Sequence, residues 1–206
     1  MCGRFALHAH PEVVKLQFGL AALPDFEPHY NIAPTMPVLI VRQAGPALVR
    51  WGLVPHWAKD ASVGARMNNA RAETVAGKPA FRDAYRSRRC LIPASGFYEW
   101  TSEFGLRQPY YVHPAAGELF AFAGLWERWR DLETCTVITT DANAKMAAVH
   151  DRMPVILSPE QYAAWLGGQE GLLQPCPEGS IAIRRVSRAV NSARNDDPSV
   201  IDPEPR

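Results

Sequence analysis

The second residue of the chain could supply two nucleophiles that no internal cysteine offers. Cys2 follows Met1 and precedes Gly3, and methionine before a small residue is commonly trimmed, which would make Cys2 the N-terminal residue. Its α-amine then titrates near ~8 and its thiol near ~8.5, so each has a reactive fraction at neutral pH. The amine condenses with an aldehyde, the thiol adds to the imine, and a five-membered thiazolidine closes. The alternative interpretation is an arbitrary residue at a frayed terminus.

Three further polar sites suit catalysis, and each has a plainer interpretation. Glu99 lies within Gly96–Trp100, where aromatic neighbours would desolvate the carboxylate and raise its pKa, as suits a proton shuttle. It could equally be a strand residue facing solvent. His150 could be an acid or base, or a satisfied residue near a helix end. Either Asn68 or Asn69 could orient a substrate or cap a turn.

Composition limits where such chemistry can take place. The chain has 22 basic and 21 acidic side chains, so any contact with DNA must come from a local arginine cluster and not from the whole surface. No window approaches the ~20 apolar residues of a membrane span, and the N-terminus has no apolar h-region, so we expect a cytoplasmic protein. The cysteines are far apart without a C-x-x-C pair, which argues against a disulfide framework, a metal site or a cofactor held by them: Cys2, Cys90, Cys135 and Cys176.

The elements that must position these residues are short, because eighteen prolines and fourteen glycines divide the chain. Helices are expected near 10–18, 79–88 and 158–166, the last from a capping-box pattern at Ser158. Strands are expected at 37–42, 47–51, 91–93, 110–113, 119–126, 134–140 and 181–186. This order predicts the α+β class: a single domain over residues 1–206, built around a curved, barrel-like antiparallel β-sheet with a few short flanking helices. The tail from about residue 197 is expected to be loose.

Six short motifs taken together are more specific than any residue alone. They are Met1–Phe5, Tyr30–Pro34, Arg50–Pro55, Asn69–Thr74, Pro93–Trp100 and His150–Pro154. In this order they closely resemble the SOS-response-associated peptidase family, also called abasic-site processing proteins. The resemblance extends from Cys2 to about Ile201, and it implies a protein of the DNA-damage response.

The resemblance implies a role for each catalytic candidate. Cys2 would link to the ring-opened aldehyde of an abasic deoxyribose after loss of Met1, by self-processing or by an aminopeptidase. Asn69 would hold the amine or the sugar. Glu99 would shuttle protons during imine formation, ring closure and reversal, and His150 would help to open the furanose. The imine also permits β-elimination, so weak lyase activity is expected beside the hydrolase or protease activity that the family name suggests.

The same resemblance implies how DNA is held. Arg4, Arg71 and Arg152 each lie two residues beyond a catalytic candidate, so they would clamp flanking phosphates; the alternative for each is a surface ion pair. Further DNA contacts are expected from Asn31, Pro34, Trp51 and Trp57, for the aromatic residues by stacking on bases, with core packing as their alternative. The expected partner is single-stranded DNA with abasic sites, bound by a monomer that is nucleoid-associated when bound. Replication-fork components are a further candidate.

Two other functions fit parts of the sequence. N-terminal-nucleophile amidohydrolases of the glutamine amidotransferase type also begin Met-Cys-Gly and attack an amide carbonyl, but the Asn-Ala-Arg, Phe-Tyr-Glu-Trp and His-Asp-Arg-Met-Pro segments have no role in that chemistry. A single-strand-binding module would leave Cys2 idle. It predicts binding that ignores an abasic site and tolerates Cys2→Ser.

Overall fold

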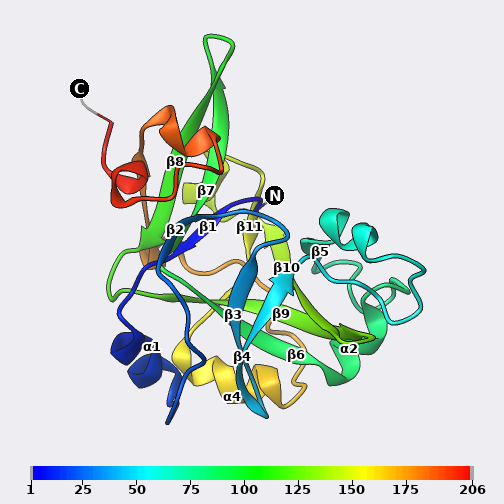
Figure 1. Ribbon diagram of the computed structural model, residues 1–206. Helices are drawn as coiled ribbons and strands as arrows, with labels where there is room; N and C mark the ends of the chain where they lie inside the picture. Colours follow the sequence, from blue (N-terminus) through cyan, green and yellow to red (C-terminus); the bar gives the residue numbers. More distant parts are fainter. Residues whose placement is uncertain (1, 205–206) are drawn as a thin grey trace.

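The structure, a computed structural model, describes residues 2–204, so the expected removal of Met1 lies outside the described residues. Figure 1 shows two β-sheets that meet near the N-terminus, with short helices around them. None of the helices in residues 2–204 is long and apolar enough to cross a membrane.

The smaller sheet is antiparallel throughout and has five strands. In spatial order they are β13 (Ile181–Arg185), β8 (Leu106–Pro114), β7 (Gly96–Glu103), β1 (Phe5–Leu7) and β2 (His29–Ile32). Strands β7 and β8 form a hairpin that extends well beyond the body of the molecule (Figure 1). One backbone feature keeps this sheet tightly packed: a Cβ on Gly96 would lie 2.5 Å from the Tyr111 hydroxyl, so only glycine admits that ring.

The larger sheet closes on itself. Its order is β11 (Arg152–Pro154), β10 (Leu132–Asp141), β4 (Gly45–Trp51), β3 (Pro37–Arg42), β6 (Arg89–Ala94), β9 (Phe120–Trp129) and β12 (Ile156–Leu157), with β5 (Asn69–Arg71) beside β10. Because β9 also pairs with β10, strands β10, β4, β3, β6 and β9 form a closed five-stranded barrel. The predicted barrel-like α+β fold is confirmed. Most pairings are antiparallel, whereas β10 runs parallel to both β4 and β5.

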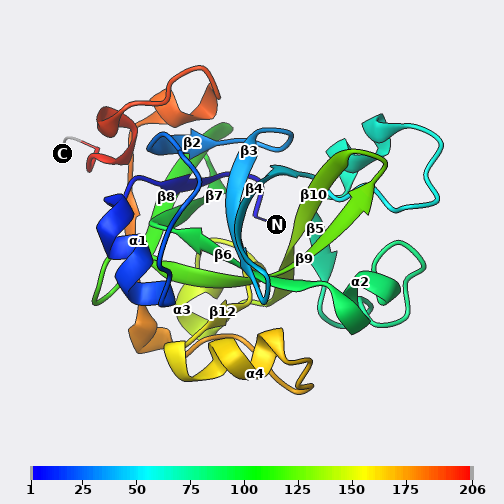
Figure 2. The same ribbon diagram turned by 60° about the horizontal axis from the view of Figure 1, so that its bottom comes forward.

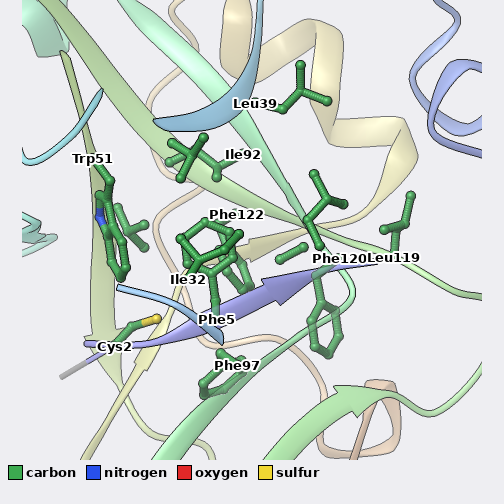
Figure 3. Close-up of a cluster of buried hydrophobic side chains, with 14 of the residues drawn as sticks. Cys2, Phe5, Ile32, Leu39, Trp51, Ile92, Phe97, Leu119, Phe120 and Phe122 are labelled. Carbon is green, nitrogen blue, oxygen red and sulfur yellow. The ribbon is translucent and has the colours of Figure 1, made fainter. Parts of the chain in front are cut away.

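The core fills the barrel and the space under the smaller sheet. Figure 3 shows its aromatic centre, where Phe5 packs edge-on against Trp51 with ring centroids 4.9 Å apart. Phe97 contacts Phe122 in the same way at 5.9 Å. Cys2 lies at the margin of this cluster (Figure 3). The N-terminal segment is therefore fixed by the core on one side.

Helices cover the outside of the barrel (Figure 2): α1 (Pro11–Phe18), α2 (Arg82–Ser87), α3 (Ala144–Ala147) and α4 (Tyr162–Leu166). Helix α1 begins with Pro11 and ends at Gly19, whose φ of 63° suits a left-handed C-cap. Before α4, the Gln161 side chain accepts a hydrogen bond from the Ser158 backbone N–H at 2.9 Å, as the capping box predicts. The three helices predicted from sequence are thus present.

The prediction of a loose tail from about residue 197 is wrong for the residues up to 204. Val200 is fully buried in the cluster under the smaller sheet, and Pro203 forms an antiparallel bridge with Val186. Glu204 pairs with Arg185. The prolines and acidic residues of the C-terminal segment predicted a solvent-exposed tail. Burial of the apolar side chain of Val200 is enough to hold this segment against the protein.

Candidate active site

Four predicted catalytic residues meet where the starts of β1, β5 and β11 approach the middle of β7. Cys2 precedes β1 and Glu99 lies in β7, and these strands pair through Phe5 and Phe97. Asn69 opens β5, and His150 precedes β11; both strands pair with β10. The two sheets therefore bring together residues almost 150 positions apart. We call Cys2, Asn69, Glu99 and His150 the catalytic corner.

Asn69 fixes the backbone of Cys2. Its Nδ2 donates to the Cys2 carbonyl oxygen at 2.6 Å, and Asn68 Nδ2 makes a longer bond to the same atom at 3.4 Å. The Asn69 Oδ1 is buried and accepts no hydrogen bond from the described residues. A buried acceptor of this kind favours an arriving N–H or O–H donor. Asn69 is thus placed to orient a group next to the Cys2 backbone.

The thiol of Cys2 lies in an apolar setting. The residue is fully buried, and burial raises the pKa of its thiol far above the ordinary value, with the nearby Glu99 carboxylate adding to the effect. Its Sγ lies 3.9 Å from the Arg4 carbonyl oxygen. The resting form is therefore the neutral thiol, and any attack by sulfur must be coupled to removal of its proton.

Glu99 and His150 form the acid–base part of the corner. Glu99 Oε2 lies 3.9 Å from His150 Nε2, and burial raises the pKa of Glu99 while His150 opposes that rise. The backbone N–H of Arg152 donates to His150 Nδ1 at 2.9 Å. His150 Nδ1 also lies 2.9 Å from the Asp151 carboxylate, so it can accept from the Arg152 N–H or donate to Asp151 according to where the ring carries its proton, and Nε2 is the nitrogen nearer Glu99.

A cavity of about 510 Å³ borders the catalytic corner at Glu99 and His150. Gly3 and Arg4 also line it. It extends outward along β7 to Arg107, which the sequence analysis did not single out. The residues that line it include two arginines and one histidine, so a negatively charged ligand is favoured. Among residues 2–204, no three His, Cys, Asp or Glu side chains converge as metal ligands.

The three predicted phosphate-binding arginines lie in different settings. Arg71 is exposed and shares a strand face with Asn69, two residues before it. Arg4 Nη1 donates to Asn31 Oδ1 at 2.7 Å and to the Val190 carbonyl at 3.0 Å. The third, Arg152, has a side chain only 12% exposed.

Arg152 is occupied by the protein itself. Its guanidinium contacts both carboxylate oxygens of Glu73, at 2.7 and 3.0 Å, and Asp141 at 2.5 Å; it also donates to the Thr139 carbonyl. This is the ion-pair alternative of the sequence analysis. The arrangement ties the segment that follows β5 to β10 and β11 beside the catalytic corner.

Two predicted DNA contacts are corrected by burial. Trp51 is fully buried, and its indole N–H donates to the Asn68 carbonyl at 2.9 Å, so its ring supports the Asn68–Asn69 segment from the core and is not available to a base. Asn31 is also fully buried, and its Nδ2 donates to backbone carbonyls of the C-terminal segment, including Asn195 at 2.7 Å. Both positions lie in apolar strands whose inward face the motif alone did not reveal.

The remaining two predicted contacts lie at the surface. Trp57 is 56% exposed. Pro34 is partly exposed in a loop that is held by a hydrogen bond of 2.7 Å from the Thr35 N–H to the Trp51 carbonyl. Thr35 has a φ of 80°, an unfavourable value for a β-branched residue. The hydrogen bond to Trp51 thus holds this backbone next to the end of β4.

The sequence of this chain is similar to those of known proteins. Residues 1–193 match the sequence profile described as SOS response associated peptidase (SRAP). The chain is 40% identical over 222 residues to the abasic site processing protein YoqW of Bacillus subtilis, covering 98% of this chain and 99% of that one. It is 33% identical over 189 residues to the abasic site processing protein HMCES of Gallus gallus, covering 75% of this chain and 56% of that one.

Solved structures show the same fold. A crystal structure of a protein from Bacteroides thetaiotaomicron superposes with a TM-score of 0.87 at 25% identity, covering 98% of this chain and all of that one. A phage-related protein from Bordetella bronchiseptica superposes with a TM-score of 0.73 at 30% identity, covering 91% and 95% of the two chains.

Proposed function

This chain belongs to the SOS response associated peptidase family, and on that premise we propose that it processes abasic sites in single-stranded DNA through a covalent adduct with Cys2. The observation that carries the proposal is the convergence of Asn69, Glu99 and His150 on Cys2. A terminal amine and thiol with an acid–base pair beside them are the groups that an aldehyde requires.

The first step exposes the aldehyde. An abasic deoxyribose is a cyclic hemiacetal, so opening it breaks the bond between C1′ and the ring oxygen, places a proton on that oxygen and removes one from the anomeric hydroxyl. His150, as the imidazolium, is suited to supply a proton from Nε2 to the ring oxygen; it is left as the neutral ring, which can take a proton back from Glu99. Glu99 accepts the anomeric proton in this scheme.

The second step makes the imine. The Cys2 amine, which requires prior loss of Met1, attacks C1′, and the carbonyl oxygen leaves as water with two protons. Both come from the nitrogen, because Glu99 gives one proton to the leaving oxygen and takes the second nitrogen proton in return. The raised pKa of Glu99 favours this role, because it suits a carboxyl that must donate a proton and then accept one. Asn69 Oδ1, a buried acceptor beside the Cys2 backbone, orients the amine.

The third step closes the ring. The Cys2 sulfur bonds to C1′, the thiol proton passes to Glu99, and the imine nitrogen receives a proton. No oxidant or further reactant is needed. The high pKa of the buried thiol explains why the amine reacts first: the sulfur becomes nucleophilic only once Glu99 can take its proton.

The imine has two other outcomes. When a proton returns to sulfur, the thiazolidine ring opens to the imine, and attack of water on the imine regenerates aldehyde and amine, so the adduct is reversible. Loss of a C2′ proton from the imine expels the 3′ phosphate by β-elimination, which gives weak lyase activity.

The test separates the amine from the thiol. The protein is incubated with a fluorescent oligonucleotide carrying one abasic site, beside undamaged DNA, and denaturing gels are read with intact mass to establish loss of Met1. Cys2→Ala should give no gel-stable adduct, yet should still be trapped as an imine by borohydride because its amine remains. A wild-type protein with a free Cys2 amine that forms no adduct would show the proposal to be wrong.

A further inference from the structure

The β7–β8 hairpin continues outward from the catalytic corner. Strand β1 pairs with β7 only as far as Phe97, with one more backbone bond from the Tyr98 N–H to the Arg4 carbonyl. Beyond Glu99, β7 has β8 on one side and no strand partner on its other side within the described residues. The cavity that holds Glu99 and His150 follows this free edge. We call residues 100–107 the hairpin arm.

The base of the hairpin arm is held by side-chain hydrogen bonds and carries positive charge. Trp100 Nε1 donates to Asn191 Oδ1 at 2.6 Å, and Asn191 Nδ2 donates to the Arg107 carbonyl at 3.2 Å. The guanidinium of Arg107 lies 4.9 Å from the Trp100 ring centroid and that of Arg4 lies 5.9 Å from it. Ser102 pairs with Arg107 across the hairpin and also lines the cavity.

Arg107 differs from Arg152 in having no carboxylate within ion-pair distance among the described residues. The nearest acid in the arm, Glu103, is bonded to Tyr110 at 2.7 Å and to Arg185 at 2.8 Å. Arg107 is exposed as well. Its charge is therefore available to a phosphate that enters the cavity.

The tip of the arm is apolar. Phe104 and Gly105 form a two-residue turn with φ values of 51° and 77°, and Phe104 is fully exposed while Leu106 is 54% exposed. Asparagine and glycine are the residues that ordinarily favour such a turn. Phenylalanine at this position is exposed to solvent and adopts a left-handed backbone conformation that it disfavours. Its ring therefore makes no evident contribution to the stability of the fold.

We propose that the hairpin arm is a binding surface for the DNA that flanks the abasic site, with a phosphate on Arg107 and a base stacked on Phe104. This inference rests on the proposed function, since it requires the cavity to hold the damaged sugar. Phe104 lies five positions beyond Glu99 along the extended chain, which corresponds to roughly 17 Å, or about five stacked nucleotides. The arm therefore reads a flank of defined length on one side of the lesion.

The experiment uses three oligonucleotides with one abasic site: ten nucleotides on both sides, the 5′ side cut to two, and the 3′ side cut to two. Adduct rates are measured below saturation for the wild type, Phe104→Asn and Arg107→Gln. Asparagine suits the left-handed turn, so Phe104→Asn keeps the hairpin. The matched control is Leu16→Gln, which removes another exposed apolar side chain, on α1.

Phe104→Asn should lower the rate of adduct formation with the long oligonucleotide by roughly tenfold. On one of the two shortened oligonucleotides, the one that lacks the flank bound by the arm, the variant and the wild type should react at the same rate. Arg107→Gln should reduce the salt slope of DNA binding by about 0.7. If the variants form adducts with the long oligonucleotide at the wild-type rate, or lose the same fraction of the rate on all three oligonucleotides, the hairpin arm does not bind the flanking DNA. Fluorescence anisotropy with undamaged DNA measures how much the hairpin arm contributes to DNA affinity when no adduct can form. Weaker binding by Phe104→Asn alongside a wild type that forms no adduct would support the arm and reject the proposed function.

Discussion

The two halves of strand β7 differ in almost every property that a functional surface can have. From Gly96 to Glu99 the strand is buried, and its first two residues, Gly96 and Phe97, pair with β1. From Trp100 to Glu103 one edge is free, and the hairpin ends in an exposed phenylalanine. Strand β7 thus holds the buried Glu99 carboxyl in its first half and leads in its second half to the exposed hairpin arm.

This difference separates two requirements. The proposed chemistry at Cys2 needs groups held in place, and each candidate catalytic residue is fixed by backbone bonds or burial. Binding a polymer needs charges and rings that the protein has not already used. Arg152 and Arg107 illustrate the contrast, because both are arginines near the same cavity and only Arg152 has carboxylate partners among the described residues.

The largest expected effect comes from a matched pair of tryptophans. Trp51→Ala should lower the free energy of unfolding by about 3–5 kcal/mol, because it empties a fully buried site beside Phe5. Trp57→Ala should change stability by less than about 0.5 kcal/mol but weaken single-strand binding by ~1–3 kcal/mol. Urea unfolding and anisotropy measure the two. Equal stability losses would remove the distinction between core and surface.

A smaller effect distinguishes positioning from phosphate binding. Arg152→Gln should lower the free energy of unfolding by about 1 kcal/mol, a figure kept modest because Glu73 and Asp141 are partly solvated. It should slow adduct formation while leaving the salt slope of DNA binding unchanged. Arg71→Gln should do the opposite, reducing the slope by about 0.7 with wild-type stability. A reduced slope in Arg152→Gln would mean that its ion pairs open to receive DNA.

The smallest expected effect is a pH dependence at the buried end of β7. Burial raises the pKa of Glu99 in the folded protein, so the folded state keeps a proton that the unfolded chain loses from about pH 4.5 upward. Stability from this group is therefore present at low pH and declines as pH rises through the folded pKa, by at most about 1.4 kcal/mol per pH unit.

Glu99→Gln should lack that decline, so thermal unfolding of the two proteins should diverge as pH rises above 4.5. His150 and Cys2 face the same carboxyl, so Cys2→Ala serves as the background in which to repeat the series. Parallel curves for the two proteins would show that Glu99 titrates normally.

The sequence predicted those features that depend on local pattern. The capping box at Ser158, the glycine after α1 and the apolar runs of β9 and β10 are each decided by neighbours in the chain. The six motifs led to the family, and the four residues that they named lie together. The barrel followed from many short strands without a regular helical crossover.

Tertiary structure decided which face each motif residue presents. Trp51 and Asn31 stand in the same motifs as surface residues, yet both are buried, because a strand's inward side depends on the sheet packed against it. Arg152 gained its carboxylates only when β5, β10 and β11 came together. Val200 held the tail because a pocket formed from residues far away in the chain. Sequence thus determined the residue types and their local elements, while burial and charge pairing were decided by contacts between segments distant in the chain.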